Sequence, residues 1–356
     1  KMMDRYPCLT IDTQKLIHNA KAVIELCGKK NIKVMAVTKL FQGNPKIAQM
    51  MVDAGVECIG DARIQNLIRL KDIKVEKALI RLPMLNEIDL LVEYADISLN
   101  SELETIRAIS DYCLEHDRKH KVVLMVDMGD RREGVNEEDV LATAQEIVKC
   151  RGVELVGLGV NFGCFGGVIP DRESMTAFMN HARSLEEKLG LKFTHITGGS
   201  SLHLHMIWED ILPEGITHLR IGQSINLGVE DKYGEVIEGL YGDIYKLHAQ
   251  VIEKKTKPSV PKGQIGIDAF GNVPVFEERG NLKRLILGIG RQDVLLGGLT
   301  PEDRDIEIMG GSSDHMILNV TNCSREYEIG DVVSFEMNYS SLLSVFNSEY
   351  VYKKFI

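Results

Sequence analysis

Ile32-Lys33-Val34-Met35-Ala36-Val37-Thr38-Lys39 is a short apolar run that ends on a lysine. Turn-forming residues bound the run, with Gly28 and Asn31 before it and Gly43-Asn44-Pro45 after it. A short run of apolar and β-branched residues between turns predicts a buried strand rather than a helix. Lys39 is then expected at the carboxyl end of that strand, which is where active sites are built in a parallel β/α barrel.

A lysine in this position has two interpretations. When it is desolvated, it can lose its proton and form a Schiff base with an aldehyde cofactor or substrate. Alternatively, Lys39 only caps the strand and reaches water. The strand alone favours the second interpretation, and the rest of the chain reverses that preference.

The length of 356 residues suggests one large domain and a smaller one. A formal net charge of −10 argues against a nucleic-acid or anionic-membrane partner. Because we find neither an amino-terminal signal pattern nor an apolar run long enough to cross a bilayer, we expect a cytoplasmic protein. The seven cysteines are scattered and include no Cys-x-x-Cys pair, which predicts reduced thiols rather than a zinc ribbon or disulfides.

Strand-like runs alternate with helix-like segments over residues 1–235. Cap and stop signals separate them, as where Asn44 and Pro45 begin a helix and Gly190 ends one. Eight such units predict a closed (β/α)8 barrel, with an open doubly wound sheet as the alternative. A further strand is expected ahead of them, at 6–11. The predicted barrel strands include 32–39, 56–60, 78–82, 97–99, 121–127, 155–162, 193–197 and 217–222.

The alternation of strands and helices stops at about residue 236, and from there strand-like runs follow one another with turns and no strong helix between them. This pattern predicts a β-rich second domain over 236–356. The fold class is therefore expected to be α/β, with a (β/α)8 barrel followed by a β-rich carboxyl-terminal domain. The runs lie at 245–253, 284–289, 305–309, 316–321 and 332–335.

Polar residues fall at the carboxyl ends of several predicted barrel strands, and a barrel enzyme needs such groups to converge at one rim. They are Lys39, Arg132, Asn161, Ser200, Ser201 and Arg220. Taken singly, the serines fit plain turn chemistry and Arg220 fits a surface salt bridge. Their common placement favours a site.

Two glycine-opened turns follow the last two strands, Gly198-Gly199-Ser200-Ser201 and Ile221-Gly222-Gln223-Ser224. Loops of this kind are the usual phosphate cradle of the barrel. A Schiff-base lysine that faces a phosphate cradle suggests pyridoxal phosphate, whose aldehyde and phosphate need those two parts.

Two other motifs carry less weight. His203 and His205 could ligate a metal, but adjacent carboxylates or thiols at ligand spacing are missing, so we expect a solvated or capping role and no metal. Ser313-Asp314-His315 contains the residue types of a hydrolase triad. Neighbours in one strand point to alternate faces, however, so they cannot form that relay together.

Together these motifs resemble the fold-type III pyridoxal phosphate enzymes, specifically the alanine racemase-like group, and most closely its ornithine-specific branch. The resemblance implies a racemase that removes and returns the Cα proton of ornithine, and a homodimer whose subunits share active sites. It covers nearly the whole chain, through Ala36–Lys39, Asp127–Gly134, His218–Gly222, Gly288–Asp293, Ser312–His315 and Asn338–Leu343.

The resemblance also implies residue roles. Lys39 matches the lysine that holds the cofactor and acts as one of two proton-transfer bases. Arg220 matches the arginine that hydrogen-bonds the pyridine nitrogen, and because a guanidinium cannot give up its proton it keeps that nitrogen unprotonated. Arg132 matches the arginine near the substrate carboxylate, and Asn161 takes the place of a histidine that packs near the pyridine-side arginine. The matches to the phosphate-binding residues are Ser201 (or Ser200), Gly222, Gln223 and Tyr339.

The chain departs from alanine racemases at two positions. Ile289 falls where their second base, a tyrosine of the partner subunit, would lie, and Met125 aligns with a lysine that some of them carbamylate. The second base therefore stays open among His315, Asp314 and Asp293, and histidine has the most suitable ordinary pKa.

These departures favour ornithine over alanine, with an acidic group expected to meet the distal ammonium. The alternatives are a racemase for lysine or alanine, a D-amino-acid aldolase or dehydratase of the same fold, and a non-catalytic carrier of pyridoxal phosphate.

Overall fold

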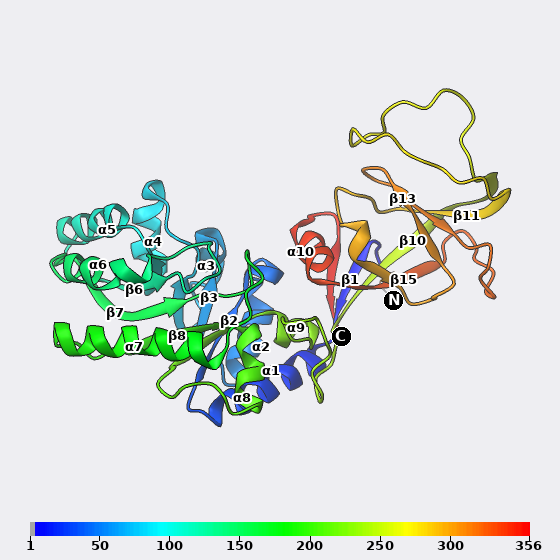
Figure 1. The fold of residues 1–356 in the computed structure, drawn as a ribbon. Coiled ribbons are helices and arrows are strands. Elements are labelled where there is room, and N and C mark those ends of the chain that lie inside the picture. Colours follow the sequence, from blue (N-terminus) through cyan, green and yellow to red (C-terminus); the bar gives the residue numbers. More distant parts are fainter. Residues whose placement is uncertain (1–3) are drawn as a thin grey trace. The chain divides into compact units, whose positions relative to one another are not determined.

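The computed structural model describes residues 4–356. It divides the described chain into a barrel unit, residues 14–242, and a β-rich unit that combines residues 4–13 with residues 243–356. Figure 1 draws both units with their labelled elements.

The barrel unit contains eight parallel strands that close on themselves. The pairing of the first strand with the last completes the ring, because Met35 lies opposite Arg220 in the register of those two strands. This closure confirms the predicted (β/α)8 barrel over the doubly wound alternative. The strands are β2 (Lys33–Val37), β3 (Cys58–Asp61), β4 (Glu76–Leu79), β5 (Ile97–Asn100), β6 (His120–Val126), β7 (Val153–Val160), β8 (His195–Ser200) and β9 (His218–Ile221).

Helices follow the strands along the chain, and their ends obey the sequence signals. The Asn44 side chain accepts hydrogen bonds from the backbone N–H groups of Lys46 and Ile47, which confirms the predicted cap. Gly190 adopts the left-handed conformation expected where a helix stops. The helices are α1 (Thr13–Gly28), α2 (Pro45–Asp53), α3 (Ile64–Arg69), α4 (Ile88–Tyr94), α5 (Leu103–Glu115), α6 (Val140–Ile147), α7 (Arg172–Leu189), α8 (Leu204–Trp208) and α9 (Gln223–Leu227).

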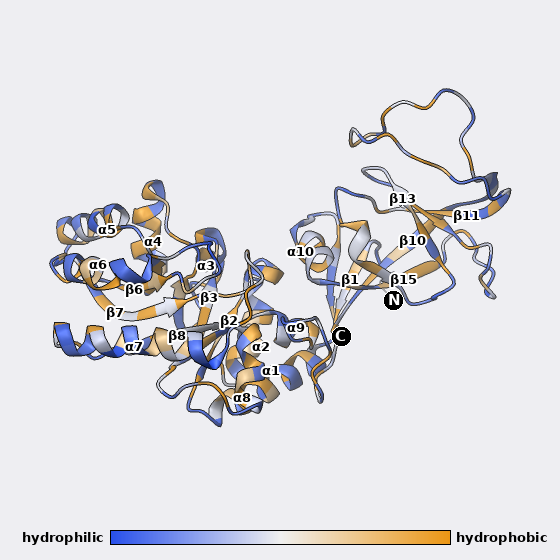
Figure 2. Ribbon diagram, in the orientation of Figure 1, coloured by the Kyte–Doolittle hydropathy of each residue, from blue (hydrophilic) through white to orange (hydrophobic). Residues whose placement is uncertain are grey.

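The strands of the barrel are predominantly apolar, whereas its helices carry both polar and apolar faces (Figure 2). Met35, Cys58 and Met125 belong to a buried cluster contributed by six different strands. Gly157 lets β7 and β8 approach each other, since a Cβ added there would lie 1.6 Å from the carbonyl oxygen of His195. Interior packing of this kind makes the barrel a filled core rather than a pore.

The β-rich unit is built around an eight-stranded sheet. Its pairings are antiparallel except for the parallel pair of β1 and β16, which confirms the predicted β-rich class. Its elements are β1 (Cys8–Ile11), β10 (Tyr245–Pro258), β11 (Asn281–Leu287), β12 (Leu299–Pro301), β13 (Glu307–Gly311), β14 (Met316–Asn319), β15 (Val332–Met337), α10 (Tyr339–Asn347) and β16 (Tyr352–Phe355).

The expected boundary between the domains was wrong. The strand predicted at 6–11 does not belong to a barrel domain of residues 1–235; β1 pairs with β10 and β16 of the β-rich unit, which begins at Asp243 rather than at 236. The barrel closes through β2 and β9 and so offers β1 no free edge. The β-rich unit also contains a helix, α10, after the last of the predicted strand-like runs, and the Asn338 side chain caps it by accepting from the Ser341 N–H at 3.0 Å.

Among residues 4–356, no helix combines the length and the apolar character that crossing a membrane requires.

Candidate active site

Lys39 lies at the carboxyl end of β2, as predicted, and opens a short 3-10 turn with its side chain exposed. The residue before it is anchored, because the Thr38 hydroxyl donates a 2.6 Å hydrogen bond to the carboxylate of Asp61. Asp61 is fully buried and also accepts from the Arg63 N–H at 2.8 Å and from the Asn66 amide at 3.1 Å. The backbone that presents Lys39 is therefore held from β3.

Arg220 is buried in the barrel interior, which excludes the surface salt bridge that its position alone would have fitted. Its guanidinium donates to the carbonyl oxygen of Val160 at 2.8 Å and to the hydroxyl of Thr197, so it links β9 to β7 and β8. Burial lowers the pKa of Arg220 to about 10, and the charge of Glu133 opposes that shift. The group therefore stays cationic at neutral pH.

Two buried polar atoms near Arg220 have no hydrogen-bond partner among the described residues, Asn161 Nδ2 and His203 Nε2. His203 Nδ1 accepts from the Ser200 N–H at 3.2 Å, so the proton is assigned to Nε2, which is left as an unused donor. Burial lowers the pKa of His203 to about 3, with the charge of Arg220 contributing. This histidine is neutral and caps the turn after β8, so the capping role is confirmed and the solvated one is wrong.

The two glycine-opened turns lie side by side. Ser201 Oγ accepts a hydrogen bond from the backbone N–H of Ser224 at 3.3 Å, which joins the turn after β8 to the turn after β9. A Cβ added to Gly222 would lie 3.3 Å from the Cβ of Val37, so the second turn also touches the end of β2 that leads to Lys39. The structure thus brings Ser200, Ser201, Gly222 and Gln223 to the rim that carries Lys39.

Arg132 lies in the loop after β6 with 44% of its side chain exposed, and it donates to the Glu133 carboxylate at 2.8 Å. Burial acts to raise the pKa of Glu133, but the hydrogen bond and charge of Arg132, together with the charge of Arg220, outweigh it and lower that pKa. Arg132 and Arg220 therefore share an ionised Glu133 between them.

Asp130 holds the loop after β7 in place at this rim. It lies within the motif Asp127–Gly134, but no role was predicted for it from the sequence. It is 2% exposed, and its carboxylate accepts backbone hydrogen bonds from Gly163 at 2.9 Å and from Phe165 and Gly166 at 3.1 Å each. The loop after β7 thus folds around the side chain of a residue from the loop after β6. An acidic residue within a Gly-rich neighbourhood was the available signal.

Asp130→Asn should loosen that loop. An amide has one acceptor oxygen and directs N–H groups at the backbone donors, so the charge-assisted bonds weaken and the free energy of unfolding should fall by about 2–3 kcal/mol. Urea unfolding measures the loss, and hydrogen exchange should show faster exchange at residues 163–168. The matched control, Asp111→Asn on the exposed face of α5, should change neither. Unchanged exchange in Asp130→Asn would contradict the anchoring role.

Asp231, in the segment after α9, is a second residue that the sequence analysis missed. Its Oδ1 is buried without a hydrogen-bond partner among the described residues. Burial, together with the charge of Glu230, raises the pKa of Asp231 to about 7 against the opposing charge of Lys39. A carboxyl that titrates near neutrality therefore lies within electrostatic reach of Lys39. Only the folded chain brings the two together, and no local pattern marks Asp231.

The raised pKa of Asp231 predicts a pH effect on stability. The native state binds the proton more tightly than the unfolded chain, whose ordinary value is 3.8, so this group lowers the free energy of unfolding as pH rises from 3.8 to about 7. Asp231→Asn removes that contribution, and its unfolding free energy should fall less than that of the parent protein across this window. Urea unfolding at several pH values measures the difference. Parallel curves for the two proteins would contradict it.

The remaining predicted site residues belong to the β-rich unit. Asp314 and His315 are exposed in the turn before β14, and Tyr339 is the first residue of α10. Asp293 is 4% exposed, and its carboxylate accepts from the Ser348 hydroxyl at 2.7 Å and from the Gly290 N–H at 3.3 Å. Asp293 is thus held by buried hydrogen bonds. Asp314 is exposed but accepts from the Gln292 amide and, at 3.0 Å, from the Ser313 hydroxyl, and His315 is exposed. The roles of these residues stay predictions.

A closed β/α barrel with a lysine after its first strand, two joined glycine turns at the same rim and a following β sheet define the alanine racemase-like class of proteins. Residues 11–227 match the sequence model of the alanine racemase N-terminal domain. The chain belongs to this family.

Two relatives match over nearly the full length of both chains. Ornithine racemase of Acetoanaerobium sticklandii is 43% identical over 352 residues, covering 99% of this chain and 100% of that protein. Lysine racemase of Thermotoga maritima is 37% identical over 350 residues, covering 98% of each. Among solved structures, alanine racemase from Bartonella henselae with covalently bound pyridoxal phosphate has a TM-score of 0.75 and 17% identity, covering 99% of this chain and 100% of that one. This last similarity shows the fold.

Proposed function

We propose that this protein is a pyridoxal phosphate-dependent racemase that interconverts L- and D-ornithine. The observation that carries the proposal is the convergence, at one barrel rim, of the exposed Lys39 with the joined Ser201–Ser224 turns and the buried Arg220. The full-length relatives that racemise ornithine and lysine support racemisation over the aldolase and dehydratase alternatives.

The side chains at the rim fit the cofactor. The unused donors of Asn161 and His203 lie among buried groups that need a polar partner, and two N–H donors of Arg220 are committed while its others are available. When bound, pyridoxal phosphate withdraws electrons from the substrate and so makes its Cα proton removable. The covalently bound cofactor of the Bartonella henselae structure supports the assignment.

We assign the residues as follows. Lys39 holds the cofactor through Nζ and moves the Cα proton on one face of the substrate. Arg220, cationic with its pKa at about 10, hydrogen-bonds the pyridine nitrogen and limits how strongly that ring withdraws electrons. Arg132 receives the substrate carboxylate. The phosphate is bound by Ser200 or Ser201 with Gly222, Gln223 and Tyr339, and Asn161 packs beside Arg220.

The second base, on the opposite face, is drawn from His315 and Asp314. Both side chains are exposed, although the Asp314 carboxylate accepts from Gln292 and Ser313, whereas Asp293 is buried and its hydrogen bonds tie it into its own unit. By the family resemblance the protein is a homodimer whose subunits share active sites. A cytoplasmic location fits the absence of a membrane-crossing helix among the described residues.

The substrate is tested by comparing initial rates. The purified, cofactor-loaded enzyme is incubated separately with L-ornithine, L-lysine and L-alanine, and the D-enantiomer is measured by chiral chromatography. We expect kcat/KM to be highest for ornithine, with lysine next. Faster turnover of alanine than of ornithine would overturn the substrate assignment while leaving racemisation in place.

A further inference from the structure

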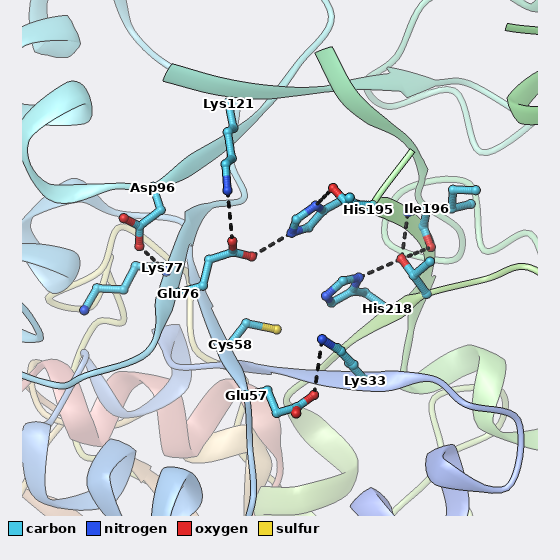
Figure 3. Close-up of polar contacts among 12 residues, drawn as sticks. Lys33, Glu57, Cys58, Glu76, Lys77, Asp96, Lys121, His195, Ile196 and His218 are labelled. Atoms are coloured by element: carbon cyan, nitrogen blue, oxygen red, sulfur yellow. Dashed lines mark hydrogen bonds and ion pairs between the residues drawn. The ribbon is translucent and has the colours of Figure 1, made fainter. Parts of the chain in front are cut away.

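A second group of titratable side chains lies at the end of the barrel opposite to Lys39. Glu76, His195 and His218 are the first residues of β4, β8 and β9, whereas Lys39 lies two residues after the last residue of β2. One ligand atom from each of the three lies within 4.8 Å of the other two. Figure 3 shows the carboxylate of Glu76 and both imidazoles converging inside the strand ends. The proposed racemase chemistry uses none of these side chains.

The imidazole of His218 is oriented so that one nitrogen is available. The Thr217 hydroxyl donates to the Ile196 carbonyl at 3.2 Å, and its oxygen lies 2.7 Å from His218 Nδ1. Thr217 Oγ1 also accepts from the Ile196 N–H at 2.8 Å. With the hydroxyl proton directed to the carbonyl, the oxygen accepts from Nδ1–H as well, and this tautomer leaves the lone pair of His218 on Nε2. In proteins, a histidine that coordinates a metal through one ring nitrogen usually donates a hydrogen bond from the other, as Nδ1 does here.

His195, like His218, has its Nδ1 beside the hydroxyl of the preceding threonine, but its Nε2 is already hydrogen-bonded. His195 Nδ1 lies 2.8 Å from the hydroxyl of Thr194, and its Nε2 lies 2.6 Å from Glu76 Oε1. The rings of His195 and His218 stack with centroids 4.7 Å apart and planes 5° apart, so their Nε2 edges face the same way. In the metal-free state His195 carries its proton on Nε2 and donates it to Glu76. To bind a metal through Nε2, His195 would adopt the other tautomer, in which Nδ1–H donates to the Thr194 hydroxyl.

The protonation states suit metal binding at neutral pH. Burial lowers the pKa of His218 to about 4, so this ring is neutral. The hydrogen bond from His195 lowers the pKa of Glu76, so the carboxylate is ionised. Neutral imidazole and ionised carboxylate are the forms that coordinate a metal.

We propose that Glu76, His195 and His218 form a Zn²⁺ site that ties β4 to β8 and β9 across the amino-terminal end of the barrel. Two imidazole nitrogens and one carboxylate oxygen are a donor set that Zn²⁺ prefers, with water in the fourth position. Tetrahedral coordination at about 2.0–2.1 Å places the ligand atoms about 3.4 Å apart, which side-chain rotation reaches from the observed spacing. The amino-terminal face of such barrels serves stability rather than catalysis.

Two neighbouring side chains, Lys121 and Cys58, bear on how the cluster would bind a metal. Lys121 Nζ lies 3.8 Å from Glu76 Oε2 and would compete with the metal for that carboxylate. The thiol of Cys58, also seen in Figure 3, donates to the Val34 carbonyl at 3.6 Å and is not needed as a ligand. Lys121→Gln should therefore bind Zn²⁺ at least as tightly as the parent protein.

The test uses the full-length, cofactor-loaded protein after removal of metals by a chelator. Titration with Zn²⁺ against a competing chromophoric chelator should show one tight equivalent per chain, with Kd below about 1 µM, and Zn²⁺ should raise the midpoint of thermal unfolding. His218→Gln and His195→Gln should each weaken binding by at least about 100-fold. His181→Gln changes a half-buried imidazole paired with Glu137 outside the cluster and should bind as the parent does.

Co²⁺ binding to the parent protein supplies a readout that needs no variant to fold. The intense visible absorption of four-coordinate Co²⁺ is the expected result. Retained racemisation by His218→Gln shows that the variant is folded, because the cluster lies away from Lys39. Absence of a tight Zn²⁺ equivalent in the parent protein would overturn the proposal, and so would equal affinity in the parent and in a folded His218→Gln.

Discussion

Lys39→Ala should lower the rate of racemisation by about 10⁴-fold or more. The substitution removes the amine that we assign both to cofactor attachment and to proton transfer on one face of Cα. Borohydride reduction followed by peptide mass analysis reads the attachment directly: the parent protein should carry the cofactor on the peptide that contains Lys39, and the variant should carry none. The fold should survive, because the Lys39 side chain is exposed and the anchor is the Thr38–Asp61 bond.

The matched control is Lys29→Ala, which removes another exposed lysine from the turn after α1. It should keep both the rate and the cofactor adduct at residue 39. Full racemisation by Lys39→Ala, or cofactor fixed to a different lysine in the parent protein, would contradict the role of Lys39.

Arg220→Gln should combine a loss of rate with a loss of stability. The neutral amide of glutamine gives the pyridine nitrogen no charge-assisted hydrogen bond, so electron withdrawal falls below even the limited level that Arg220 allows, and we expect kcat to fall by about 100-fold or more. It also weakens the bonds to the Val160 carbonyl and the Thr197 hydroxyl deep in the barrel, and the free energy of unfolding should fall by about 2–4 kcal/mol.

The two effects of Arg220→Gln are separated by their controls. Steady-state kinetics is measured on protein that still carries the cofactor on Lys39, so that the rate reflects chemistry rather than unfolding. Arg220→Lys keeps a charge but cannot make both bonds, and it should fall between the parent and Arg220→Gln. Arg107→Gln, at an exposed ion pair, should change neither quantity. An unchanged kcat in Arg220→Gln would contradict its assigned contact.

The barrel strands could be predicted because their signal is local. A run such as Val34–Val37 is buried on both faces and flanked by turn residues, so a few neighbouring residues are enough to predict a strand there. The polar residues at the strand ends followed from the same reasoning, since closure of the barrel brings all carboxyl ends to one rim.

Features that depend on distant partners could not be predicted in this way. The strand at Cys8–Ile11 was placed in the wrong unit because its partners, β10 and β16, lie more than two hundred residues away in the chain. The carboxylate of Asp130 acquires its role only where the loop after β7 folds against it. Glu76, His195 and His218 come from the starts of three separate strands, so their spacing in the sequence does not form a recognisable metal-binding motif.

The most direct test of the account is racemisation in deuterated water. Purified, cofactor-loaded protein is incubated with L-ornithine, and the product is analysed by chiral chromatography and mass spectrometry. We expect D-ornithine with one deuterium at Cα, since the proton returned to that carbon comes from a base that exchanges with solvent. No deuterium at Cα of ornithine, lysine or alanine would contradict it.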